Sequence, residues 1–215
     1  MAVDTAPSAC TELLASASIE VTPREPGVAQ TLRDHFAAGI DVHVTFLPDD
    51  SADKAAETCA RLRQAGFNPI PHLTARNFPD RDVLQSQLAR LSRDAKVSRA
   101  LVIAGDVDRP RGMFSSSIEV IETGLLERNG VETVLIAGHP EGHPAVADPV
   151  LETALVEKIA AARRHGLKAE IVTQFSFEAE PIGRWLTRLR SIGVDAPVRI
   201  GIAGPAHRRR WSEAG

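Results

Sequence analysis

The feature that most constrains the fold is a regular alternation of short apolar runs with segments whose apolar residues recur at helical spacing. Seven runs have the length and composition of buried strands. They are residues 17–21, 40–47, 67–74, 99–106, 132–139, 169–177 and 197–203. Between them, apolar residues return every three or four positions, as Leu84, Leu88 and Leu91 do. Strict alternation of strand and helix predicts a parallel sheet covered by helices.

Residues that begin and end helices agree with this register. Ser51 and Asp148 stand at predicted N-caps, and Pro149 suits the first turn of a helix. Glycines follow the predicted helix ends, where a left-handed residue commonly terminates a helix. These glycines are Gly39, Gly66, Gly130, Gly166 and Gly193.

Two architectures satisfy the alternation: an open doubly wound sheet and a closed (β/α)8 barrel. The open dinucleotide-binding fold carries Gly-x-Gly-x-x-Gly after its first strand, and this chain has no such turn there. Polar side chains such as Glu20 and His72 also share one side of the strands. In the sixth run the same alternation puts Gln174 and Ser176 on the polar side and Phe175 on the apolar side. An open sheet would bury both sides, so we predict an α/β TIM barrel with ligands at the carboxyl ends of its strands.

The chain has 215 residues, of which 43% are hydrophobic, so it is long enough for one substantial core. Barrels of this kind typically run to about 250 residues, and here the last apolar run ends at residue 203. We therefore expect an incomplete barrel of seven strands with the eighth missing, whose open edges a second copy of the chain would cover. The predicted organisation is an N-terminal extension at 1–16, a single barrel-like catalytic domain at 17–205 and a basic tail at 206–215.

The net charge of −3 comes from interspersed acidic and basic residues, which argues against a surface built for nucleic acid. No stretch approaches the ~20 apolar residues that cross a bilayer, and residues 1–16 lack the features of a secretory signal. Cys10 and Cys59 are too few for a disulfide framework, and Cys59 falls on an apolar helical stripe. These features predict a reduced, cytoplasmic protein with neither membrane nor nucleic acid as a partner.

The stretch His139-Pro140-Glu141-Gly142-His143-Pro144 directly follows the fifth predicted strand. It places two imidazoles and a carboxylate at a strand end, where barrels hold their chemistry. These side chains are also plausible zinc or iron ligands. Metal-dependent barrels, however, usually assemble ligands from several strand ends, and the first strand offers no histidine pair. We therefore expect no metal site.

Several polar residues also have purely structural interpretations. His43 and His72 could be core histidines bonded to backbone carbonyls. Asp148 could simply cap a helix, and Asp106 could begin a turn.

Six segments resemble the methylenetetrahydrofolate reductases, flavin-dependent (β/α)8 enzymes of one-carbon metabolism. They occur in the family's order at successive predicted strand ends, and they span most of the chain from Ser18 to Pro205. The segments are Ser18-Ile19-Glu20, Val44-Thr45, Pro71-His72-Leu73-Thr74, Ala104-Gly105-Asp106, residues 139–144 and Thr173-Gln174-Phe175. The chain is identified as a divergent, C-terminally short member of that family.

The resemblance implies a role for each matching residue. Glu20 corresponds to the general acid that protonates a bridging nitrogen of 5,10-methylenetetrahydrofolate. Asp106 corresponds to an acid beside the flavin and the folate, and Gln174 to an amide that orients the folate and the nicotinamide. Residues at the cofactor-binding positions are Thr45, His72, Asp106, His139, His143 and Lys158.

The resemblance therefore implies an oxidoreductase that interconverts 5,10-methylenetetrahydrofolate and 5-methyltetrahydrofolate, with FAD as cofactor and NADH or NADPH as co-substrate. The chain also departs from the family. Ala104 replaces an Arg, His139 replaces a Tyr, and Ser176 replaces an aromatic residue. An alternative is a non-catalytic folate-binding or accessory barrel that has lost flavin, and a metal-dependent hydrolase is a third interpretation.

Overall fold

A computed structural model describes residues 16–25, 27–47 and 50–203 of the chain. Strands and helices alternate through these ranges, and all seven predicted strands are present. The chain divides into two compact units at the junction of Glu132 and Thr133. The predicted basic tail and all but the last residue of the predicted N-terminal extension lie outside the described residues. The single domain at 17–205 stays a prediction.

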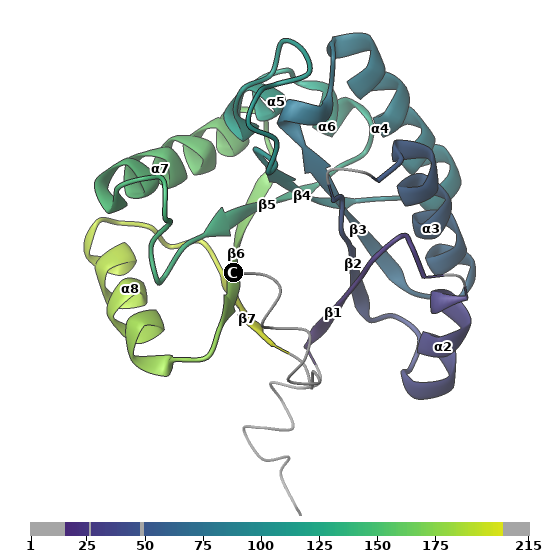
Figure 1. The fold of residues 1–215 in the computed structure, drawn as a ribbon, viewed down its shortest axis with the longest axis horizontal. Coiled ribbons are helices and arrows are strands. Elements are labelled where there is room, and N and C mark those ends of the chain that lie inside the picture. Colours follow the sequence, from purple (N-terminus) through teal and green to yellow (C-terminus); the bar gives the residue numbers. More distant parts are fainter. Residues whose placement is uncertain (1–15, 26, 48–49, 204–215) are drawn as a thin grey trace, which may run out of the picture. The chain divides into compact units, whose positions relative to one another are not determined.

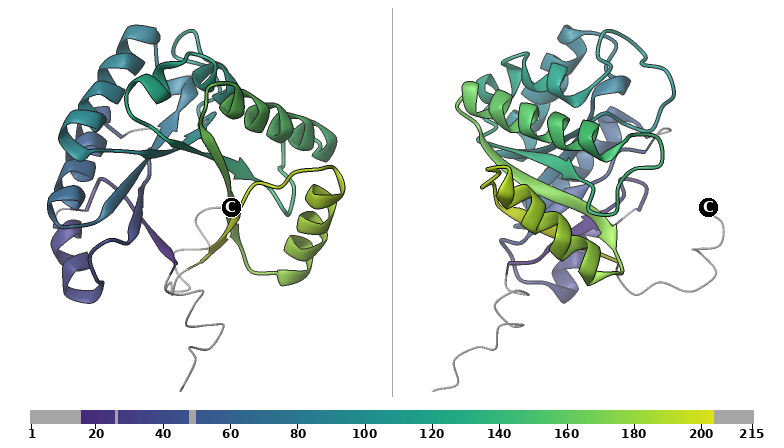
Figure 2. Two further views of the ribbon diagram at one scale, coloured as in Figure 1. Left: turned by 180° about the vertical axis from the view of Figure 1, so that it is seen from behind. Right: turned by 90° about the vertical axis from the view of Figure 1, so that its left-hand side faces the viewer.

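The first unit contains four parallel strands, each paired with the next along the chain. Its strands are β1 (Ser18–Val21), β2 (Asp41–Val44), β3 (Asn68–Thr74) and β4 (Arg99–Ile103). Its helices are α2 (Val28–His35), α3 (Ala52–Gln64), the 3-10 turn η1 (Ala75–Asn77), α4 (Arg81–Ala95), α5 (Ser117–Ile121) and α6 (Leu125–Arg128). Figures 1 and 2 show α3 and α4 side by side along one side of β2 and β3.

The core of the first unit lies between these helices and the strands. Leu84, Leu88 and Leu91 form one stripe of α4, and none of them is more than 2% exposed. The helix begins at Arg81, and the Asp80 carboxylate caps it by accepting a hydrogen bond of 2.8 Å from the Val83 backbone N–H. Cys59 on α3 is fully buried in the same core, and burial raises the pKa of its thiol to about 12.

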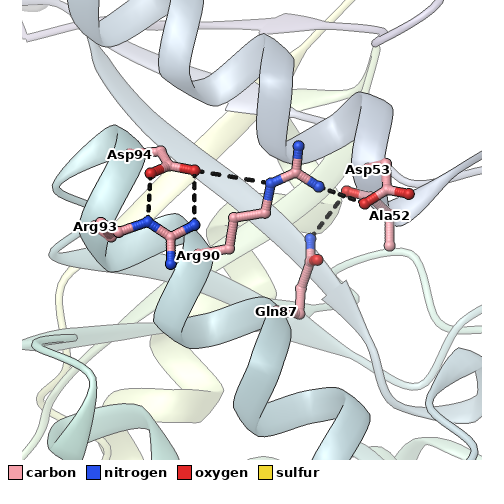
Figure 3. Close-up of polar contacts among 6 residues, drawn as sticks. All are labelled: Ala52, Asp53, Gln87, Arg90, Arg93 and Asp94. Atoms are coloured by element: carbon pink, nitrogen blue, oxygen red, sulfur yellow. Dashed lines mark hydrogen bonds and ion pairs between the residues drawn. The ribbon is translucent and has the colours of Figure 1, made fainter.

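Polar contacts connect α3 and α4 along their outer surface (Figure 3). The Arg90 guanidinium lies between Asp53 of α3 and Asp94 of its own helix. Gln87 Nε2 also donates a hydrogen bond of 3.0 Å to the Ala52 carbonyl at the start of α3. Because the Asp53 side chain is 84% exposed, its ion pair with Arg90 adds little to the free energy of unfolding. The network acts mainly by fixing how α3 and α4 are aligned.

The second unit contains three parallel strands, β5 (Thr133–Gly138), β6 (Lys168–Ser176) and β7 (Val198–Ile202). Helices α7 (Asp148–Arg164) and α8 (Ala179–Ser191) connect them and lie on the same side of the strands (Figure 1). Trp185 of α8 packs against the end of β5, so closely that a Cβ on Gly138 would lie 2.6 Å from its indole Cη2. No helix within the described ranges is long and apolar enough to cross a membrane.

Two predicted helix features are wrong in detail. Asp148 is not an N-cap, because α7 begins at Asp148 itself and Ala147 occupies the cap position. The Asp148 side chain instead reaches Gly142, where a Cβ would lie 3.1 Å from Asp148 Oδ1. The helical spacing of apolar residues between the fourth and fifth predicted strands indicates one helix, but the chain there forms the two short helices α5 and α6. Gly124, whose φ of 68° is left-handed, lies between them.

Candidate functional site

Three side chains meet at the carboxyl ends of β1, β2 and β3 in the first unit. The strand register places Glu20 opposite His43. His72 Nε2 lies 3.4 Å from His43 Nδ1 and 3.8 Å from Glu20 Oε2. The sequence identified Glu20 and His72 as functional but assigned no role to His43. The signal in the sequence that could have identified His43 is its place on the polar side of β2, opposite Glu20.

The protonation of this group depends on burial. Desolvation, and secondly the neighbouring His43, lowers the pKa of His72 to about 3, so its imidazole is neutral at physiological pH. Desolvation also raises the pKa of the Glu20 carboxyl, although 64% of that side chain remains exposed. A partly desolvated carboxyl group therefore faces a neutral imidazole, and this arrangement is suited to proton donation.

Thr45 and Asp106 follow β2 and β4 at the same ends of the strands. The Thr45 hydroxyl oxygen is buried and has no hydrogen-bond partner among the described residues. Asp106 is exposed in the turn after β4. Gly105 allows this turn to approach β3, because its φ is +96° and a Cβ there would lie 3.1 Å from Thr74 Cβ. A buried unpaired hydroxyl is costly, so Thr45 is a candidate to bind a polar ligand group.

A second group of nitrogen donors follows β5 in the second unit. The rings of His139 and His143 lie edge to face with their centroids 5.5 Å apart. Desolvation, and then the nearby His143 and Lys158, lowers the pKa of His139. Burial likewise lowers the pKa of Lys158 on α7. The Ala145 N–H donates to His143 Nδ1 at 3.1 Å, so Nδ1 accepts and Nε2 is the ring nitrogen left to donate to a ligand. The chemistry of this donor set suits an anionic oxygen ligand.

The acidic residue of the 139–144 stretch has a different partner. Glu141 accepts a hydrogen bond from the Ser176 hydroxyl at the end of β6. Within the part of the chain that the structure describes, no three His, Cys, Asp or Glu side chains are grouped closely enough to hold a metal ion.

Gln174 lies near the end of β6, where the strand is irregular. Val172 pairs with Arg199 and Phe175 with Gly201, so two residues of β6 stand opposite one residue of β7. The extra residue reverses the alternation of side chains beyond it. The predicted sides of Phe175 and Ser176 are therefore wrong: Phe175 is 42% exposed and Ser176 only 7%. Gln174 itself is exposed.

The structure thus brings the predicted residues together in two groups, one in each unit. Glu20 and His72 meet in the first unit, with His43 added. His139, His143 and Lys158 gather in the second. The remaining predicted residues lie at or just beyond strand ends: Thr45 after β2, Asp106 after β4 and Gln174 on β6.

Comparisons with solved structures show the fold. The chain superimposes on 3-dehydroquinate dehydratase from Aquifex aeolicus with a TM-score of 0.52 and 11% identity, over 85% of this chain and 78% of that one. It matches the type I 3-dehydroquinate dehydratase from Clostridium difficile with a TM-score of 0.51 and 13% identity, over 87% and 74% of the respective chains. Both are TIM barrels, so the predicted barrel class is confirmed, with seven strands in the described residues.

Comparisons of sequence show the family. The chain is 32% identical over 124 residues to a type I polyketide synthase of phenolphthiocerol synthesis from Mycobacterium marinum. That alignment covers 56% of this chain, which spans only 6% of the synthase's length. By contrast, the methylenetetrahydrofolate reductase family matches residues 24–204. Because that match covers most of the chain and includes the strand-end residues from Thr45 to Gln174, the protein belongs to the methylenetetrahydrofolate reductase family.

Proposed function

We propose that the protein is an oxidoreductase that interconverts 5,10-methylenetetrahydrofolate and 5-methyltetrahydrofolate, with FAD as bound cofactor and NADH or NADPH as co-substrate. The observation that carries this proposal beyond family membership is the Glu20 carboxyl 3.8 Å from a neutral His72. The reaction opens a five-membered ring, and that step requires a proton at the ring nitrogen that leaves. Glu20 is the group in the first unit best suited to deliver it.

His72 allows Glu20 to hold its proton. An imidazole with an ordinary pKa near 6.5 would compete with the carboxyl for the proton and form an ion pair. Because the pKa of His72 is about 3, its ring does not take the proton at neutral pH. Desolvation raises the pKa of Glu20 and so enlarges the fraction of molecules in which this carboxyl is protonated. The protonated carboxyl passes its proton to the substrate nitrogen.

The residues present fit a flavin with a pyrophosphate. His139, His143 and Lys158 supply nitrogen donors for phosphate oxygens, and Thr45 offers a buried hydroxyl without a partner. When bound, FAD supplies the hydride-transfer chemistry. In this proposal the family resemblance assigns cofactor binding to Thr45 and His72 in the first unit and to His139, His143 and Lys158 in the second. It assigns Asp106 the role of an acid that would act on both the cofactor and the folate.

Gln174 has the complementary task of orientation. Its exposed amide has both donors and an acceptor, which suits recognition of a pterin edge or a nicotinamide carboxamide.

The competing proposal is an accessory protein without flavin. The observation that favours it is Ala104, which replaces the arginine that the family places before Gly-Asp.

The direct test is FAD binding by the purified protein. We expect FAD to copurify or rebind at about micromolar concentration and to raise the melting temperature, because a ligand bound only by the folded state stabilises it. Lys158→Met should weaken FAD binding about tenfold or more, since a charge-assisted hydrogen bond is lost. Lys168→Met is the matched control, because Lys168 is exposed at the start of β6. A colourless protein with no thermal shift at saturating FAD would overturn the proposal and favour the accessory role.

A further inference from the structure

The irregular register of β6 and β7 is stabilised by a specific contact. Thr173 and Gln174 together stand opposite Ile200, which is a bulge of a kind that is rare between parallel strands. At this point the Gly201 backbone N–H donates to the Thr173 hydroxyl, Oγ1, at 2.9 Å. The Thr173 side chain thus accepts a backbone donor of the neighbouring strand. Thr173 is 5% exposed, so water competes little for this bond.

Gly201 also lies too close to the bulge for any larger residue. A Cβ on Gly201 would lie 2.8 Å from the Thr173 carbonyl oxygen and 3.0 Å from the Phe175 nitrogen. It would also lie 3.1 Å from the Gln174 carbonyl carbon. These are backbone atoms, which cannot move aside as a flexible side chain would. Glycine in a strand interior weakens the strand, and it often marks a site where another part of the backbone approaches closely. Gly201 is such a site.

The bulge determines where the side chains at the end of β6 lie. A bulge re-aims side chains, and those beside active sites commonly serve that purpose. We propose, resting on the proposed function, that Gly201 and Thr173 are positioning residues that hold the bulge and thereby aim the Gln174 amide at the folate. Gln174 contacts the substrate in this scheme, and Gly201 and Thr173 act only through it.

Four variants separate this role from a general loss of stability. Gly201→Ala places a methyl group against the bulge, and Thr173→Val removes the acceptor while keeping the shape. Thr173→Ser restores the hydroxyl and should rescue the defect. Gly183→Ala is the matched control, because a Cβ on Gly183 in α8 would meet nothing within 4 Å.

The first measurement is binding of 5-methyltetrahydrofolate by isothermal titration calorimetry. We expect Gln174→Ala, Gly201→Ala and Thr173→Val each to weaken binding by about five- to tenfold, the effect of one hydrogen bond. Thr173→Ser and Gly183→Ala should bind as the wild type does. Gly201→Ala combined with Gln174→Ala should bind no more weakly than Gln174→Ala alone, because both act through the same amide. Additive losses, or normal binding by Gly201→Ala and Thr173→Val, would overturn the proposal.

A second measurement does not depend on folate. The side-chain amide signals of Gln174 in a nitrogen-15 NMR spectrum report its surroundings directly. They should shift in Thr173→Val and return toward the wild-type position in Thr173→Ser. If the wild type binds no folate, the proposed function fails, and these signals still decide whether Thr173 positions Gln174. Unchanged Gln174 signals in Thr173→Val would exclude that role. This result decides the question even if the Gly201→Ala variant fails to fold.

Discussion

At the scale of single residues, the chemistry of the first unit depends on which of two neighbouring groups holds a proton. His72 is neutral because it is buried, and Glu20 lies 3.8 Å from it. This arrangement gives the carboxyl a task that a glutamine cannot perform, since an amide keeps the shape and hydrogen bonding but has no acidic proton.

Glu20→Gln should therefore separate the two half-reactions. We expect folate-dependent turnover to fall by at least ~10²-fold, the lower end for general acid catalysis. Reduction of the flavin by NAD(P)H, followed with an artificial electron acceptor, should fall by less than about tenfold, because it needs no proton from Glu20. Glu157→Gln, on the exposed side of α7, should leave both rates unchanged. Equal losses in both half-reactions would show that Glu20 is not the acid.

At the scale of elements, the position of α8 depends on how closely it approaches β5. A Cβ on Gly138 would lie 2.6 Å from Trp185 Cη2 and 2.7 Å from Ile171 Cγ2. We expect Gly138→Ala to lower the free energy of unfolding by about 1–3 kcal/mol, the usual cost of overpacking. Urea unfolding measures this loss. Adding Trp185→Phe should recover part of it by making room, and an undiminished loss in the double variant would contradict the packing argument.

The elements also show what a sequence can and cannot predict. All seven strands follow from apolar runs and turn residues, because those signals are local. The bulge in β6 does not, since an extra residue is defined only by the strand opposite. The reversed sides of Phe175 and Ser176 follow from that one insertion. The contact of His43 with His72 likewise depends on strand pairing and on the direction of each ring, which the sequence does not specify.

At the scale of the whole molecule, the buried His72 couples folding to pH. In the unfolded chain its pKa returns to about 6.5, whereas in the folded protein it is about 3. Between these values the unfolded state binds a proton that the folded state does not. The free energy of unfolding should therefore decrease as the pH falls from about 6.5 toward about 3, by up to about 1.4 kcal/mol per pH unit from this group.

His72→Gln should remove this contribution. Compared with the wild type, the variant should lose less stability between about pH 7 and pH 4 in urea unfolding experiments. His35→Gln provides the control, because His35 is exposed on α2. Parallel pH profiles for His72→Gln and the wild type would show that the ring is not held neutral by burial.

The thiol of Cys59 has a consequence for oxidation. Only the thiolate reacts with peroxides and disulfides, and burial holds the pKa of this thiol at about 12. At neutral pH about one molecule in 10⁵ carries the thiolate, and its surroundings also exclude the oxidant. Cys59 thus behaves as a small apolar side chain, and α3 keeps its core packing when the surrounding solution becomes oxidising.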